Sequence, residues 1–294
     1  TLFRSDASML DLMASLRASP PLSVNTPHGR VQYRCAGQAS HVTHVLLHGI
    51  GSGSASWVTQ LASAQDRQDV RVLAWEAPGY GESTPLPMLA PLAADYARQM
   101  WAWLDALQQQ GEDVSHPFVL VGHSLGALMA ASAVKMRPQA LAQLVLLSPA
   151  KGYGDAPAQE RDDKLNTRLQ NLQQWGPEGM AQRRSQAMLS ASATQQQLQW
   201  VRDIMGQVQP HGYAQAAHML AQGTLLRDVV NLPCAVTVAS GQADTITPPD
   251  VCALVAREAG VSWVSLGSVG HACALEASGR VNALLGLTAV ERVS

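Results

Sequence analysis

The pentapeptide Gly122-His-Ser-Leu-Gly126 constrains the fold of this 294-residue chain more than any other segment, because it joins a predicted strand to a predicted helix. Phe118–Val121 has the composition of a buried strand, and Leu125–Lys135 carries apolar residues at helical spacing. Glycine at both ends lets the strand and the helix pass almost in contact. The backbone at Ser124 must then be strained, which raises its hydroxyl above the sheet edge. This G-x-S-x-G turn predicts a nucleophilic serine.

A second glycine-rich loop follows the predicted strand Val42–Leu47 and begins at His48. No Gly-Lys-Ser/Thr follows it, which argues against a phosphate-binding loop, and its glycines lack the dinucleotide-binding spacing. A flexible connector is the simplest alternative. Beside the serine turn, however, we expect the loop to form half of an oxyanion hole. The donors would be the backbone N–H groups of Ile50 and Leu125.

Two further polar residues come directly after predicted strands. Asp244 follows the strand Cys234–Ala239, and His271 follows the strand Ser262–Leu266. Because parallel strands end at the same edge of a sheet, we expect both side chains to lie near Ser124. The chain order of serine, acid and histidine is that of a hydrolase triad. In such a triad His271 takes the serine proton, and Asp244 fixes the tautomer of the imidazole.

Strands and helices alternate in two parts of the chain that flank a stretch of helices alone. We therefore predict an α/β fold in which helices flank a mostly parallel central sheet. Residues 1–148 and 232–294 would form this core, and residues 149–231 would form a helical cap inserted between strands. The expected cap helices are Asp162–Trp175, Pro177–Leu189, Ala193–Met205 and Ala214–Leu225. Outside the cap we expect a helix at Ser5–Arg17, begun by Ser5 or Asp6, and one final helix at Ala274–Leu285.

Composition excludes several classes of protein. The net charge is -2 without a basic stripe, which argues against nucleic-acid binding. Apolar residues reach 47% and charged residues only 14%, which is typical of a compact enzyme. No apolar run has membrane-spanning length and no signal-peptide pattern is present, so we expect a cytoplasmic protein without a membrane partner. The first residue is not Met, which leaves a removed leader open. The four cysteines lack metal-site spacing and are expected to be structural thiols.

Five segments together resemble the α/β-hydrolase superfamily over nearly the whole chain: Leu46–Trp57, Ala77–Ser83, Val121–Ala127, Ser240–Pro249 and Gly270–Glu276. Within it the chain is similar to 3-oxoadipate enol-lactonases, ring-cleavage product C–C hydrolases and small esterases. This resemblance implies hydrolysis of a small carboxylic ester or lactone through an acyl-serine at Ser124, without a metal or organic cofactor. C–C hydrolases usually carry Asn and an aromatic residue where this chain has His123 and Ala272. Ser124 excludes the Asp nucleophile of epoxide and haloalkane hydrolases.

The triad leaves the reaction and the substrate open. The alternatives are C–C bond hydrolysis, acyl transfer or perhydrolysis, and a role as a hydrolase-fold ligand receptor with little turnover. The expected partner is a small molecule, and the sequence does not indicate an oligomeric state. The apolar cap residues that either line the pocket or pack between helices are Trp175, Met180, Met188, Trp200, Met205 and Met219. Arg183, Arg184 and Arg202 are candidates for binding a substrate carboxylate, with solvated surface as the simpler interpretation.

Other polar residues near the motifs have structural interpretations. We expect Glu76 to bond the N–H groups of a nearby loop, His48 to stabilise the glycine-rich loop and His123 to pack beside the serine turn. Glu276 is expected at the surface or behind the site. Asp155 is an alternative triad acid, because it follows the strand before the cap and some hydrolases carry the acid there.

Overall fold

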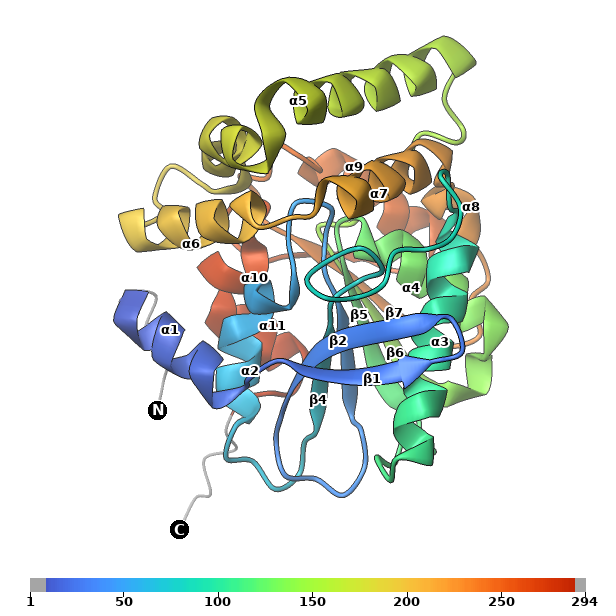
Figure 1. Cartoon of the computed structure of the whole chain (residues 1–294), viewed down its shortest axis with the longest axis vertical. Coiled ribbons are helices and arrows are strands. Elements are labelled where there is room, and N and C mark those ends of the chain that lie inside the picture. The colour runs from blue at the N-terminus through green and yellow to red at the C-terminus, as the bar shows by residue number, and fades with distance from the viewer. Residues whose placement is uncertain (1–8, 289–294) are drawn as a thin grey trace.

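The computed structural model describes residues 9–288, built around one eight-stranded sheet (Figure 1). Its strand order is β1-β2-β4-β3-β5-β6-β7-β8. The strands are β1 (Leu22–Thr26), β2 (Gly29–Ala36), β3 (His44–Leu47), β4 (Val72–Trp75), β5 (Phe118–His123), β6 (Leu141–Leu147), β7 (Ala235–Ser240) and β8 (Trp263–Ser265). Pairing is antiparallel between β1 and β2 and between β2 and β4, and parallel throughout the rest. The mostly parallel sheet predicted from the sequence is confirmed.

Helices cover both faces of the sheet, because the central strands carry apolar side chains on both sides. On one face lie α3 (Ala93–Gln109), α4 (Gly126–Met136) and α9 (Pro249–Glu258). On the other face lie α2 (Val58–Ala64), α10 (Cys273–Glu276) and α11 (Ser278–Leu284). The first described helix, α1 (Met9–Ala18), packs on α2 and ends before the Pro20-Pro21 pair, as predicted. Its expected cap at Ser5 or Asp6 lies outside the described residues.

Four helices and one short 3-10 turn connect β6 to β7. They are α5 (Ala158–Arg184), η3 (Ser185–Met188), α6 (Gln195–Gly206), α7 (Pro210–Gln222) and α8 (Leu225–Asp228). The first two helices expected here are both present within α5, because Gly176, with a non-helical φ of 62°, divides it just before Pro177, at the predicted junction. Figure 1 shows α5 lying across one end of the molecule, over α6 and α7. The cap boundaries at 149 and 231 stay a prediction.

Several elements differ from the sequence expectations. Strand β1 was not expected, and neither was the turn η1 (Ser54–Trp57) with the helix α2 that follows it. The single final helix is wrong: it is divided into α10 and α11 by Ala277, whose φ of -111° and ψ of 38° are not helical. The end of α10 is therefore free to turn Glu276 toward the loop that holds His271.

Candidate active site

The serine turn between β5 and α4 has the strain that its sequence predicts. Ser124 has a φ of 53°, a left-handed conformation that costs free energy in a residue with a side chain. A Cβ atom placed on Gly122 would lie 2.6 Å from the carbonyl oxygen of Gly126. One placed on Gly126 would overlap the carbonyl group of Leu47 at the end of β3. Glycine is therefore required at both positions for the turn to hold Ser124 at the edge of the sheet.

The glycine-rich loop lies against this serine with its carbonyl groups turned to other partners. Buried His48 donates from Nδ1 to the Gly49 carbonyl at 2.8 Å and accepts the Ala77 N–H on Nε2 at 3.0 Å. Burial lowers the pKa of His48, so its imidazole stays neutral in this bridging role. The Tyr80 hydroxyl donates to the Ile50 carbonyl at 2.6 Å. His48 therefore stabilises the loop, as the sequence indicated.

Two backbone N–H groups beside the serine remain available to a ligand. Within residues 9–288, the N–H groups of Ile50 and Leu125 have no hydrogen-bond acceptor. A Cβ placed on Gly49 would lie 3.1 Å from the Ser124 Cβ, so the loop passes directly beside the nucleophile candidate. This is the arrangement an oxyanion hole needs, with fixed donors beside the position where negative charge develops. The donor role of these two residues stays a prediction.

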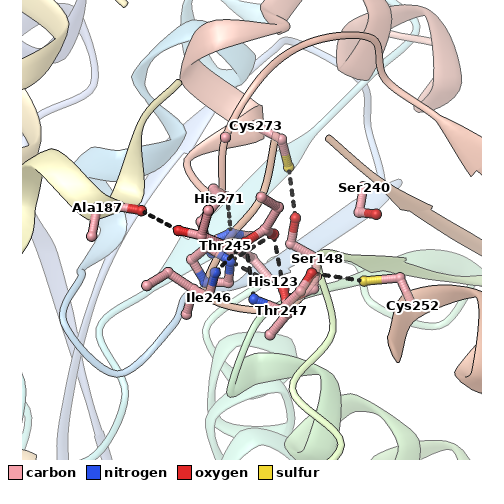
Figure 2. Close-up of polar contacts among 12 residues, drawn as sticks. His123, Ser148, Ala187, Ser240, Thr245, Ile246, Thr247, Cys252, His271 and Cys273 are labelled. Atoms are coloured by element: carbon pink, nitrogen blue, oxygen red, sulfur yellow. Dashed lines mark hydrogen bonds and ion pairs between the residues drawn. The ribbon is translucent and has the colours of Figure 1, made fainter. Parts of the chain in front are cut away.

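Asp244 and His271 form a buried hydrogen-bonded pair in the loops that follow β7 and β8; Figure 2 shows His271 beside Thr247. His271 donates from Nδ1 to Asp244 Oδ2 at 2.9 Å. The other carboxylate oxygen accepts the N–H groups of Ile246 and Thr247, each at 2.9 Å. Burial alone would raise the pKa of Asp244, but His271, the Thr247 N–H and the Ser148 hydroxyl together lower it to about 2. Asp244 is therefore an anion at any ordinary pH.

Ser124 and His271 border the same cavity. No hydrogen bond joins the Ser124 hydroxyl to the imidazole in the described part of the chain. Such contacts are often long in proteins without a bound substrate. Nucleophilic catalysis by serine uses three groups: the serine, a histidine, and a carboxylate bonded to Nδ1 of that histidine.

Thr247 is a site residue that sequence reasoning missed. Its hydroxyl lies 2.9 Å from Asp244 Oδ2, 3.0 Å from the Ser148 carbonyl oxygen and 3.1 Å from His271 Nδ1. A hydroxyl has one proton, so it donates to only one of the two oxygens at a time. The available signal was a hydroxyl residue three positions after the acid in the Gly-Gln-Ala-Asp-Thr-Ile-Thr loop.

Glu276 joins the histidine loop to the last part of the helical segment. It accepts the Gly270 N–H at 2.9 Å and the Ser190 hydroxyl at 2.5 Å. Close by, the Ala272 N–H donates to the Met188 carbonyl at 2.8 Å. Glu276 thus lies behind the site, one of the two positions expected for it. Its bond to Gly270 fixes the backbone before His271, and the bond from Ala272 to Met188 fixes the backbone after it.

The remaining candidates have structural partners. His123 is buried and bonds through Nε2 to the His271 carbonyl at 2.8 Å, and burial beside His271 lowers its pKa to about 3. It is the packed neighbour of the serine turn that the sequence indicated. Glu76 accepts the N–H and the hydroxyl of Ser54, which confirms its role in holding a loop. Asp155 forms an ion pair with Arg227 and does not contact His271, so it is not the acid of the pair.

The cavity has a volume of about 190 Å³ and lies between the glycine-rich loop, the strand ends and helices α5 to α7. A side cavity of about 40 Å³ shares the wall at Met188 and extends past Trp200 and Ala272. Of the six apolar candidates, Met180, Met188 and Met205 border the main cavity and Trp200 the side cavity. Trp175 and Met219 border neither and pack within the helical segment.

Residues 9–288 contain neither a metal-binding cluster nor a membrane-spanning helix. No group of three or more His, Cys, Asp or Glu side chains is placed to hold a metal ion. No helix in this range is both long and apolar enough to cross a membrane. All four cysteines are free thiols, as the sequence predicted.

The fold, with its candidate site at the carboxyl edge of the sheet, is that of a hydrolase-type enzyme. A sequence model of the alpha/beta hydrolase family matches residues 45–284, and the chain belongs to this family. The predicted fold and the hydrolase class are thereby confirmed.

Individual relatives share the core to different extents. A 2-hydroxy-6-oxononadienedioate/2-hydroxy-6-oxononatrienedioate hydrolase of Paraburkholderia phymatum is 30% identical over 150 residues, which cover 49% of this chain and 50% of the relative. The chain spans 31% to 50% of the length of the curated relatives it matches.

Solved structures match over most of the chain. A thermophilic esterase from Thermogutta terrifontis superposes with a TM-score of 0.76 at 21% identity, covering 91% of this chain and 97% of the esterase. The enol-lactonase from Burkholderia xenovorans LB400 gives 0.75 at 19% identity, covering 91% and 99%. At these identities the likeness establishes the fold.

Proposed function

We propose that this protein is a serine hydrolase that cleaves a small carboxylic ester or lactone through an acyl-serine intermediate. The observation that carries the proposal is the buried Asp244–His271 pair opening into the cavity that the strained Ser124 also borders. Residues 149–231 would act as the cap over this cavity. The proposed chemistry uses protein groups and water alone.

Each residue has a defined role in the reaction. His271 takes the proton of the Ser124 hydroxyl as the oxygen attacks the carbonyl carbon, and the N–H groups of Ile50 and Leu125 bind the resulting oxyanion. His271 then gives its proton to the leaving alcohol. A water molecule, deprotonated by His271, cleaves the acyl-enzyme in the same way. Asp244, anionic because its pKa is about 2, stabilises the imidazolium that forms in each half.

Ester or lactone hydrolysis is favoured over C–C cleavage by two residues and by the size of the cavity. His123 is engaged with the His271 carbonyl, so it is not free to take the part of the Asn usual in C–C hydrolases. Ala272 leaves open the small side cavity that an aromatic residue would fill. The main cavity of about 190 Å³ suits a substrate with few heavy atoms. An esterase and an enol-lactonase are among the proteins with the same fold.

The test is the hydrolysis of p-nitrophenyl esters of increasing acyl length, together with simple lactones. We expect a burst of p-nitrophenol equal to the enzyme concentration, then steady turnover that declines once the acyl chain exceeds the cavity. Ser124→Ala should lose both phases. Ser132→Ala, a half-buried serine of α4 that borders neither cavity, is the matched control and should keep them. Folded protein without turnover on any of these substrates would contradict the proposal.

A further inference from the structure

The main cavity has a one-sided charge. Lys151, Arg168 and Arg184 border it, and none of its described lining residues is Asp or Glu. Concave surfaces lined by one sign of charge concentrate the field and attract ligands of the opposite sign. The cavity therefore favours an anion independently of the chemistry at Ser124.

These three cations lack the carboxylate partners that most other basic residues have. Arg71 pairs with Glu112, and Lys135 with Asp228, each at 2.7 Å. Within residues 9–288, by contrast, Lys151, Arg168 and Arg184 form no ion pair with a carboxylate. Their charges are left for a ligand to compensate.

One of the cations is held in place without being neutralised. The Arg168 guanidinium lies 5.6 Å from the ring centre of Tyr153, and its Nη1 donates to the Lys164 carbonyl at 3.3 Å. Tyr153 itself borders the cavity. A planar guanidinium positioned in this way keeps N–H groups that match the two oxygens of a carboxylate.

The other two cations lie on segments bonded to the reacting groups. Lys151 follows Ala150, whose N–H donates to the Ser124 carbonyl at 3.1 Å. Arg184 ends α5 just before η3, and η3 accepts the Ala272 N–H next to His271. The backbone that carries each of these two cations is thus bonded close to Ser124 or to His271.

The side cavity has the opposite character. Its described lining contains no Asp, Glu, Lys or Arg, and its walls include Trp57, Trp200 and Leu275. At about 40 Å³ it accepts only a short group, and an apolar one, because a charge there would lose its hydration without a partner.

We propose that the substrate carries a carboxylate in addition to its ester or lactone group, and that Arg184, Arg168 and Lys151 bind this carboxylate. The substrate class is thus a small ester or lactone of a dicarboxylic acid or of a hydroxy acid, with a short apolar part in the side cavity. This inference rests on the proposed function for its reaction and on the cavity charges for its anion site.

The structure also sorts the arginines that the sequence offered as candidates. Arg183 stacks on Trp175 at 4.6 Å and does not border the cavity, although it is the neighbour of Arg184. Arg202 donates to the Ser185 hydroxyl at 3.4 Å and does not border the cavity either. Arg183→Gln is therefore a control of equal charge change beside the test residue.

The experiment compares anionic and neutral esters of matched size. In the first pair, mono-p-nitrophenyl glutarate carries a carboxylate on the acyl side and p-nitrophenyl pentanoate does not. In the second pair, 4-carboxyphenyl butyrate carries the carboxylate on the leaving group and phenyl butyrate does not. We expect kcat/KM to favour the anionic member of one pair. Arg184→Gln and Arg168→Gln should each reduce this preference by about tenfold or more, because a charge-assisted hydrogen bond is lost. All rates of Arg183→Gln should stay unchanged, and in the two test variants the rate on the anionic ester should fall by more than the rate on its neutral partner.

A binding measurement separates failure of the anion site from failure of the hydrolase function. Calorimetric titration with glutarate should show binding to the unaltered protein and to Arg183→Gln, weakened by salt and lost in Arg184→Gln. If neutral esters are turned over without an anionic preference in either pair, the carboxylate proposal is wrong and the hydrolase function stands. If no ester is turned over but glutarate binds as expected, the proposed reaction fails and the anion site stands. Absence of both glutarate binding and an anionic preference overturns the anion site.

Discussion

Replacing Thr247 with Val removes one hydroxyl from the centre of the site and keeps the branched shape of the side chain. That hydroxyl lies 2.9 Å from Asp244 Oδ2, 3.0 Å from the Ser148 carbonyl and 3.1 Å from His271 Nδ1. A methyl group in its place donates no hydrogen bond to the carboxylate, so Asp244 is held less firmly in line with His271 Nδ1. A hydrogen bond to a charged group contributes about 1.5–3 kcal/mol, and 1.4 kcal/mol corresponds to a factor of ten. We therefore expect kcat for ester hydrolysis to fall by roughly 10- to 100-fold.

The same change should also lower stability. The hydroxyl bonds either the Ser148 carbonyl or the Asp244 carboxylate, so its removal leaves one buried acceptor without a donor and costs about 1–3 kcal/mol of unfolding free energy. The assay is kcat and KM on a p-nitrophenyl ester, measured beside urea unfolding at the same pH. Thr247→Ser retains the hydroxyl and is the matched control, with kcat expected near that of the wild type. A folded Thr247→Val protein with wild-type kcat would refute the positioning argument.

Three further predictions follow from burial and close packing. The pKa of Asp244 falls to about 2 on folding, from about 3.9 in an unfolded chain. The stability that this carboxylate contributes is therefore complete above about pH 3.9 and is lost as the pH falls through 2. Over this pH range the unfolding free energy should drop more steeply in the wild type than in Asp244→Asn. In Gly126→Ala the new methyl group would overlap the Leu47 carbonyl, so we expect the unfolding free energy to fall by about 1–3 kcal/mol. An unchanged melting temperature would contradict this prediction. Burial raises the pKa of Cys252 to about 11 and that of Cys273 to about 12, so iodoacetamide at mildly alkaline pH should leave both thiols unmodified by mass spectrometry until the protein unfolds.

The central strands could be predicted because they are apolar on both faces and end in polar loops. β5 begins at Phe118, as predicted, and continues to His123. α2 was missed because Thr59 and Gln60 on its buried face are polar and both bond the Ala274 carbonyl, which hides the apolar periodicity. β1 was missed for a related reason, since Val24 is its one buried residue.

The three candidate catalytic residues could be predicted because each follows a strand, and strand ends meet at one edge of the sheet. The residues that support these three could not be predicted. Glu276 meets Ser190 across 86 positions, and that contact depends on how two loops pack together. The direction of the cap side chains depends on the break at Gly176, so the sequence could not distinguish Arg184 in the cavity wall from Arg183 on Trp175.

The last part of the helical segment is bonded to both loops that carry the site. The Thr245 hydroxyl donates to the Ala187 carbonyl at 3.4 Å, next to Asp244 in sequence (Figure 2). The Ala272 N–H donates to the Met188 carbonyl, next to His271. Arg184 precedes these residues in the chain, so a ligand bound to its guanidinium would act on a segment that is bonded to the loops of Asp244 and His271. Binding energy from a remote carboxylate can then be used to orient the reacting groups, which raises kcat as well as lowering KM.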